Sequence, residues 1–211
     1  MKGLLLLSGG FDSAVAGFLL QNKDFTVVPV HFSSQPFTDD EAEAKSQKIA
    51  AILRMPGLHI VNIAKALERF ANECNHRLYF VLTKRFMLRV SERLADSIGC
   101  SVLITGESVG QVSSQTLTNL TVISSAVRIP ILRPLIGLNK NEIINIARTA
   151  GTHDVSIGPE LCDLLGPRHP RTKAKLEEVL AEEARLDINE LTAETLLSAK
   201  YIQLPSQLVG A

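Results

Sequence analysis

The chain changes from wholly apolar to polar within ten residues near its start, Leu4-Leu5-Leu6-Leu7-Ser8-Gly9-Gly10-Phe11-Asp12-Ser13. Four consecutive leucines are typical of a strand that is buried on both faces, as strands of parallel sheets are. Asp12 and Ser13 then open an apolar run over residues 14–20, which favours a helix. The stretch therefore predicts a strand, a tight turn and a helix.

The turn itself, Ser8-Gly9-Gly10, has the properties of an anion site. Its small residues let backbone N–H groups approach an anion closely. The unpaired N–H groups and the dipole of the following helix favour phosphate at the same place. Asp12 adds a carboxylate there, which is expected if a divalent cation bridges it to the anion. Two glycines alone would fit an ordinary capped turn, but the whole string after an apolar strand is more specific.

Length and composition narrow the possibilities. The 211 residues, 45% hydrophobic and 21% charged, suffice for one α/β domain with a small appendage. The net charge of zero gives no global attraction to nucleic acid, so RNA contacts would need local basic patches or a partner. Three widely spaced cysteines form no disulfide framework, and no apolar run approaches a membrane span. We therefore expect a soluble, cytoplasmic protein that does not bind membranes.

Strand and helix patterns alternate along the chain. Further strands are expected at residues 25–32, 58–63, 101–105 and 128–132. Helices are expected at residues 38–54, 79–98 and 139–151, together with one that begins at residue 64 and one that ends near residue 126. Pro29 lies inside one strand, which usually implies an edge or a bulge. Thr38 with Glu41 forms a capping box, and Asn139 caps a later helix. The alternation predicts a doubly wound, mainly parallel, five-stranded α/β sheet with ligands at the carboxyl ends of its strands.

The last quarter of the chain differs in character. Residues 157–170 are rich in glycine and proline, and residues 172–183 and 189–200 predict charged amphipathic helices. We expect a main domain over residues 1–170 and a helical C-terminal appendage over 171–211 that packs on it.

Two further motifs lie at predicted strand ends. His31 and Phe32 could flank an adenine, although ordinary packing would also explain a buried aromatic ring. The polar loop Thr105–Thr116 contains Gly106 and Gln115 and offers backbone donors and amides that could cover a nucleotide.

Basic residues form two groups. Arg85, Arg89 and Arg93 repeat every four residues and so share one face of a predicted helix. This face could be exposed to solvent, or it could contact the phosphates of ATP or RNA. Arg168, Arg171 and Lys173 form a second cluster, beside the predicted loop over residues 157–170, and could contact an RNA backbone.

The motifs occur in one order, and together they resemble a known family. They are Ser8–Ser13, His31-Phe32, Lys84–Arg89, Thr105–Thr116, Arg133–Gly137 and Gly151-Thr152. The chain resembles, over about residues 3–173, the PP-loop ATP pyrophosphatase domain of the tRNA 4-thiouridine synthetases, tRNA sulfurtransferases also tied to thiamine biosynthesis. Neither the RNA-binding module nor the rhodanese domain of longer members fits in this chain, so we expect a stand-alone form.

This resemblance implies an activity and a set of site residues. ATP would adenylate the 4-oxygen of a uridine in tRNA, and sulfur would displace AMP. Magnesium would be held by Asp12 through the phosphates, and Asp12 and Cys162 would be catalytic. The residues implied in ATP binding are Leu6, Leu7, Ser8, Gly9, Gly10, Asp12, Ser13, His31, Phe32, Lys84, Arg85, Gly106 and Gln115.

Cys162 is assigned a catalytic role because it lies in a predicted loop at the position that matches the family's catalytic cysteine. Without that resemblance, a single cysteine is more often an unreactive residue of the packed interior. Arg168 and Arg171 could lower its pKa. Cys74 and Cys100 are interpreted as structural. The sulfur would come from an external donor, and tRNA binding would need a separate RNA-binding partner, a dimer or the basic patches.

Two other functions are compatible with the sequence. The chain could adenylate a small molecule, including a thiamine precursor, or it could be a non-catalytic nucleotide-binding or sulfur-carrier subunit of a larger complex.

Overall fold

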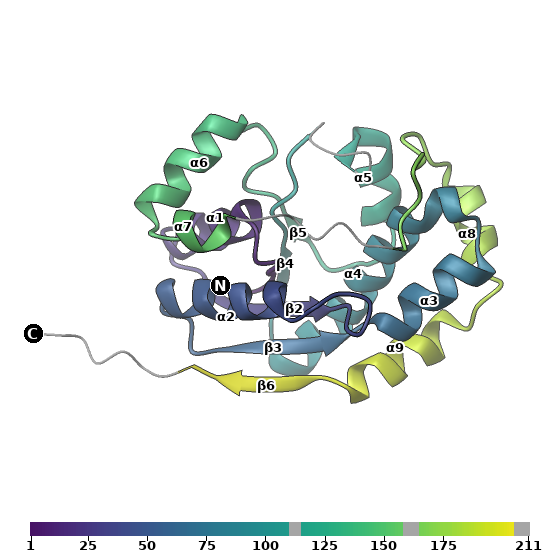
Figure 1. Cartoon of the computed structure of the whole chain (residues 1–211), viewed down its shortest axis with the longest axis horizontal. Coiled ribbons are helices and arrows are strands. Elements are labelled where there is room, and N and C mark those ends of the chain that lie inside the picture. Colours follow the sequence, from purple (N-terminus) through teal and green to yellow (C-terminus); the bar gives the residue numbers. More distant parts are fainter. Residues whose placement is uncertain (110–114, 158–164, 205–211) are drawn as a thin grey trace, which may run out of the picture.

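The computed structural model describes residues 1–109, 115–157 and 165–204, and it shows a six-stranded sheet between two layers of helices (Figure 1). The strand order is β5-β4-β1-β2-β3-β6. The bounds are β1 Lys2–Leu6, β2 Thr26–Ser33, β3 Gly57–Asn62, β4 Val102–Ile104, β5 Ile131–Leu132 and β6 Lys200–Gln203. All neighbours are parallel except β3 and β6. The predicted doubly wound, mainly parallel α/β fold is confirmed.

The helices divide between the two faces of this sheet. One face is covered by α1 (Phe11–Gln21), α2 (Glu41–Ile52), α6 (Lys140–Thr149) and α7 (His153–Ser156). The other is covered by α3 (Ala64–Glu73), the 3₁₀ turn η1 (His76–Leu78), α4 (Tyr79–Ile98), α5 (Leu117–Ser124), α8 (Leu176–Glu183) and α9 (Ile188–Leu197). Each layer closes its own apolar core against the sheet.

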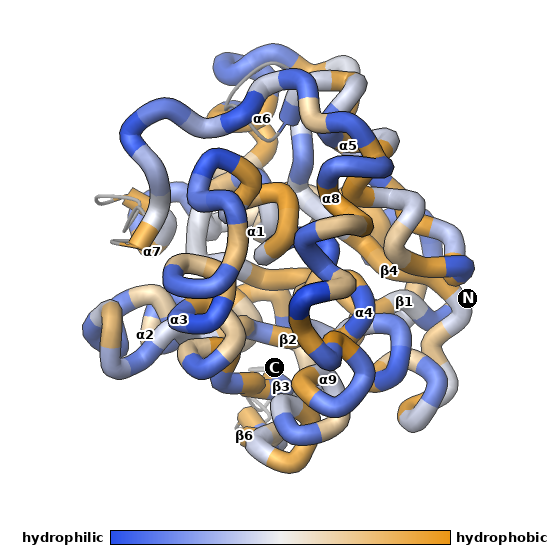
Figure 2. The backbone as a smooth tube through the Cα atoms, turned by 90° about the vertical axis from the view of Figure 1, so that its right-hand side faces the viewer, coloured by the Kyte–Doolittle hydropathy of each residue, from blue (hydrophilic) through white to orange (hydrophobic). Residues whose placement is uncertain are grey.

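The leucines of β1 show why this strand is apolar throughout. Leu4 belongs to the core beneath α4, whereas Leu5 belongs to the core beneath α1, because successive side chains of a strand point to opposite faces. Both are fully buried. Figure 2 shows that hydrophobic residues gather along the central strands and hydrophilic residues on the outer turns.

The predicted strand around Pro29 is confirmed, but it is neither an edge nor a bulge. Pro29 pairs in register with Leu5 of β1, and β3 pairs with β2 only from Val30 onward. The missing N–H of proline therefore precedes the residues that pair with β3, and it costs no ladder hydrogen bond there.

Two local expectations were wrong. The second helix begins at Glu41 with Asp40 as its N-cap, so Thr38 is not the cap. The sheet has a sixth strand that the sequence did not predict, β6, which pairs antiparallel with β3 at the edge. The capping box at Asn139 and Glu142 is confirmed.

The C-terminal segment packs closely on the rest of the chain. Val179 of α8 and Leu191 of α9 are buried in the core beneath α4, and the two helices begin at Leu176 and Ile188. In the described part of the chain, no helix is both long and apolar enough to cross a membrane.

Candidate active site

The turn after β1 has the geometry of an anion-binding loop. Gly9 has a φ of +86°, and a Cβ atom there would lie 2.9 Å from the carbonyl oxygen of Ala42 in α2. A side chain at this position would therefore be strained and would also collide with α2. Glycine allows the loop to lie flat against α2.

Hydrogen bonds between serines close this loop. The Oγ of Ser13 accepts from the backbone N–H of Ser8 at 3.1 Å and donates to the carbonyl of Gly10 at 3.2 Å. Gly10 is the N-cap of α1, and no side chain caps the helix there. Helix N-termini of this kind, with the positive end of the helix dipole, favour anions, and Asp12 lies in the first turn.

The two strongest sequence motifs lie against each other. A Cβ atom on Gly106, just after β4, would lie 2.4 Å from the carbonyl carbon of Asp12 and 2.5 Å from the backbone nitrogen of Ser13. Only glycine permits this approach of the loop after β4 to the first turn of α1. The structure therefore brings Asp12 and Gly106 together, as expected for parallel strands whose carboxyl ends meet at one edge.

A pocket of about 170 Å³ opens beside this loop, at the ends of β1 and β2. Five of its lining residues were predicted from the sequence: Leu6, Leu7, Ser8, His31 and Phe32. The others are Ser33, Ser34, Thr38, Asp39, Ala42, Glu43 and Met87. Sequence reasoning missed these residues, although the polar stretch after His31-Phe32 was a signal for Ser33 and Ser34.

His31 is held in one defined state at the base of this pocket. Its Nδ1 lies 2.9 Å from the carbonyl oxygen of Leu7 and 3.0 Å from the Oγ of Ser46. A carbonyl oxygen can only accept, so Nδ1 carries the proton and Nε2 is an acceptor. Burial lowers the pKa of His31, which favours the neutral ring.

Lys84 joins a charged cluster at the ends of β4 and β5. Its Nζ donates to Glu107 at 2.8 Å, and the Nε of Arg133 donates to the other oxygen of the same carboxylate at 2.8 Å. Burial alone would raise the pKa of Glu107, but Lys84 and Arg133 outweigh it and lower this pKa. The carboxylate therefore stays ionised between two cations.

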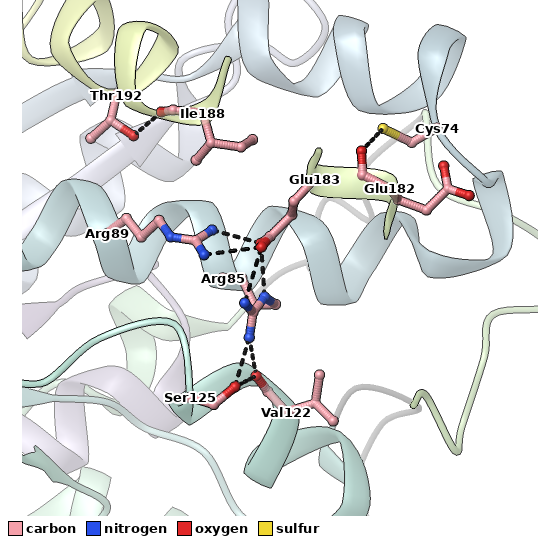
Figure 3. Close-up of polar contacts among 9 residues, drawn as sticks. All are labelled: Cys74, Arg85, Arg89, Val122, Ser125, Glu182, Glu183, Ile188 and Thr192. Carbon is pink, nitrogen blue, oxygen red and sulfur yellow. Dashed lines mark hydrogen bonds and ion pairs between the residues drawn. The ribbon is translucent and has the colours of Figure 1, made fainter. Parts of the chain in front are cut away.

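Two members of the predicted basic stripe on α4, Arg85 and Arg89, point to Glu183 of the C-terminal helix α8 (Figure 3). Arg85 is 1% exposed and donates from Nε and Nη2 to Glu183 of α8, while its Nη1 donates to the Val122 carbonyl and to Ser125. Arg89 donates to the same carboxylate at 2.6 and 2.9 Å.

Placing Arg85 at ATP was therefore wrong: its guanidinium is buried against α5 and α8. Arg89 is committed to Glu183. Arg93 donates to Asn189 of α9 but is exposed, so its contact with RNA stays a prediction. Burial raises the pKa of Glu183, but the hydrogen bonds from the two arginines lower it further than burial raises it.

The later basic group is more accessible. Arg168 and Lys173 are exposed, whereas Arg171 is partly buried and pairs with Glu178 at 2.9 Å. The backbone N–H of Arg171 donates to the carbonyl of Arg77, which places this segment beside the exposed 3₁₀ turn before α4.

The remaining predicted residues differ in what the structure says of them. Cys162 lies outside the described residues. Gln115 precedes α5, and its Oε1 is buried without a hydrogen-bond partner among the described residues. Burial, with a smaller effect of Glu182, raises the pKa of the Cys74 thiol to about 11, and burial also raises that of Cys100. Both thiols are thus unreactive at neutral pH, in keeping with a structural role.

Metal ligands are not concentrated anywhere in the part of the chain that the structure describes: it contains no group of three or more His, Cys, Asp and Glu side chains placed to hold an ion.

Comparison with known proteins identifies the family. The family model for the thiamine biosynthesis protein ThiI matches residues 1–188. A probable tRNA sulfurtransferase of Coxiella burnetii is 43% identical over 210 residues, which cover 96% of this chain and 53% of that protein. One of Caldanaerobacter subterraneus is 41% identical over 192 residues, which cover 88% and 50%.

A solved structure gives the same result. The crystal structure of a 4-thiouridine synthetase in complex with RNA and ATP matches this chain with a TM-score of 0.90 and 35% sequence identity. The match covers 96% of this chain and 55% of the chain in that crystal structure. The chain spans about half the length of the curated relatives that it matches. By its sequence and its fold, the chain belongs to the ThiI family.

Proposed function

We propose that the chain carries the ATP-dependent step of a tRNA sulfurtransferase. It would adenylate a uridine of tRNA at its 4-oxygen, release pyrophosphate, and allow a sulfur nucleophile to displace AMP. One observation carries this proposal: the uncapped glycine loop between β1 and α1, with Asp12 in its helix turn, against which Gly106 packs. The names of the relatives and the ATP and RNA in the related crystal structure support the same reaction.

ATP fits the residues that are present. The flat loop at Gly9 and the first-turn N–H groups of α1 suit a polyphosphate. The adjoining pocket has an apolar wall, Leu6 and Phe32, and an acceptor at His31 Nε2, which suits an adenine with its exocyclic amine. We place the phosphates at Ser8–Ser13 and the base in the pocket, and we expect Gln115 and Lys84 to contact the nucleotide as well.

Asp12 is the residue that would hold magnesium together with the phosphates. A bound Mg²⁺ would neutralise charge on the departing pyrophosphate. The chain's own contribution is the row of N–H donors, which stabilises the same charge without reorganisation.

The adenylation has a clear chemical purpose. The uridine oxygen forms a bond to the α-phosphorus while the bond to pyrophosphate breaks. The 4-oxygen then leaves with AMP when sulfur attacks the ring carbon. We assign the sulfur-handling thiol to Cys162, with sulfur from an external donor, and the RNA backbone to Arg168, Arg171 and Lys173. Because the net charge is zero, we expect an RNA-binding partner or a dimer to contribute affinity.

The test is reconstitution with ATP, magnesium, sulfide and unmodified tRNA, with and without a THUMP-type RNA-binding partner. Release of AMP and thiolated uridine, measured by chromatography and mass spectrometry of the tRNA, is the expected result. If AMP and thiolated uridine are both absent under both conditions, the proposal is refuted. AMP release stimulated by a small metabolite and not by tRNA would support the second candidate, a small-molecule sulfur transfer, which the neutral net charge favours.

A further inference from the structure

Glu107 stands out among the buried carboxylates because of what surrounds it. It is 7% exposed and accepts hydrogen bonds from Lys84 of α4, Arg133 after β5, and the hydroxyl of Thr105. Arg133 in turn donates from Nη2 to Ser124 of α5 at 2.9 Å. One carboxylate thus connects four elements of the fold: α4, α5 and the ends of β4 and β5.

This cluster adjoins the anion loop. Glu107 is the next residue after Gly106, whose backbone packs against Asp12 and Ser13. Lys84 lies one helical turn before Met87, which lines the pocket, so the two residues share a face of α4. The cluster therefore follows directly on the residue that packs against the anion loop, and its lysine shares a helix face with a residue of the pocket.

The charges of the cluster do not cancel. Two cations share one carboxylate, which leaves a net charge of about +1 beside the loop. Lys84 makes one hydrogen bond among the described residues, so two of its three N–H donors remain for a ligand. A lysine side chain is flexible and loses much rotamer freedom when it is ordered, and the ion pair with Glu107 orders it in advance.

We propose that Glu107 and Arg133 are positioning residues for the adenylation step: Glu107 holds the Lys84 ammonium against the polyphosphate, and Arg133 fixes the orientation of the Glu107 carboxylate. This inference deepens the proposed function and rests on it. Glu107 and Arg133 do not supply the affinity for ATP. They fix the position of the Lys84 ammonium relative to the pyrophosphate that leaves.

The Glu107→Gln variant tests this role. It keeps the size of the side chain and removes a negative charge beside the anion site, so ATP affinity should stay within about twofold or become tighter. The rate of AMP formation should fall roughly 10- to 100-fold, because Lys84 is no longer fixed. Equilibrium binding of ATP and single-turnover AMP formation measure the two quantities separately.

Glu183→Gln is the matched control. Glu183 is also buried and also pairs with two cations, Arg85 and Arg89, but it lies on the C-terminal helix α8 and not beside the anion loop. Its rate of AMP formation per folded molecule should equal that of the wild type. An unchanged rate in Glu107→Gln, or affinity and rate that fall together, overturns the proposal.

Arg133→Lys gives a second readout if Glu107→Gln fails to fold. It keeps the charge but loses the planar fork, so the rate should fall at least threefold with unchanged affinity. An unchanged rate overturns the role of Arg133. If the wild-type chain itself binds no ATP, the proposed function fails, which is a different result from a normal rate in these variants.

Discussion

Gly106 approaches Ser13 so closely that a Cβ atom on it would lie 2.5 Å from the Ser13 backbone nitrogen. This contact joins two motifs that lie almost a hundred residues apart in the sequence. It sets the distance between the anion loop and the segment after β4, and the first prediction follows from it.

Gly106→Ala should damage both the fold and the site. The added methyl group meets backbone atoms, which cannot move aside without displacing α1, so we expect a loss of about 1–3 kcal/mol in the free energy of unfolding. ATP affinity should fall as well. Gly137→Ala is the matched control, because no atom of the described residues lies within 4 Å of a Cβ at that position. Urea unfolding and equilibrium ATP binding measure both effects; a Gly106→Ala variant that binds ATP normally would contradict this account of the loop.

Gly9→Ala should abolish ATP binding. Its φ of +86° and the 2.9 Å approach to the Ala42 carbonyl both oppose a side chain. Gly99 also has a positive φ, +71°, but no atom within 4 Å of its Cβ position, at the end of α4. Gly99→Ala should therefore lose roughly 1 kcal/mol of stability and keep its ATP affinity. Equal loss of binding in the two variants would mean that backbone strain, and not the loop, is responsible.

Glu183→Gln should destabilise the protein in a pH-dependent manner. The folded-state pKa of Glu183 is lowered, so its ion pairs stabilise the fold above its unfolded pKa near 4.5, and this stabilisation is lost as the pH falls through the lower folded value. At pH 7 the variant leaves the buried Arg85 and the partly buried Arg89 without their carboxylate, and we expect a loss of about 3 kcal/mol.

The difference between wild type and Glu183→Gln in urea unfolding should be largest above pH 5 and shrink as the pH is lowered below 4.5. The half-exposed pair Lys65–Glu194 provides a control, since Glu194→Gln should cost less than about 1 kcal/mol at any pH. A pH-independent difference for Glu183→Gln would contradict the assignment.

The contrast between β1 and α4 shows what the sequence could predict. Leu4–Ser13 was predicted correctly because strand, turn and helix signals lie within ten consecutive residues. The arginine stripe was misread because its partner, Glu183, lies 98 residues after Arg85. Four-residue spacing establishes that arginines share a helix face, but it says nothing of what covers that face.

β6 and Arg133 illustrate the same limit. A four-residue edge strand depends on the partner beside it, and no local pattern in Lys200–Gln203 specified β3 as that partner. Arg133 lies in a motif that the sequence singled out, yet its contact with Glu107 appears only when β4 and β5 lie side by side. Sequence motifs predict where the candidate site lies, whereas its charge distribution depends on tertiary contacts that local patterns do not specify.

Asp12→Ala should lower the rate of AMP formation at least 100-fold while the protein stays folded. Asp12 lies in the first turn of α1, where the proposed ion would be held, and truncation there opens no apolar core. Single-turnover formation of AMP and a thermal unfolding curve measure the two effects. Full activity in this variant would favour a non-catalytic nucleotide-binding role for the chain.

Cys162→Ser should separate the two halves of the reaction. The proposed adenylation needs the anion loop before α1 and the pocket, and Cys162 is not among the described residues that form them, so AMP-linked tRNA should still form. Sulfur incorporation should stop, because a serine hydroxyl cannot carry or resolve sulfur as a thiolate can. Pyrophosphate release and mass spectrometry of the tRNA uridines measure the two steps on one sample. Cys100→Ser, at a buried cysteine under the sheet, is the control and should leave both steps intact. If Cys162→Ser loses pyrophosphate release together with thiolation, the thiol contributes to structure rather than to sulfur transfer.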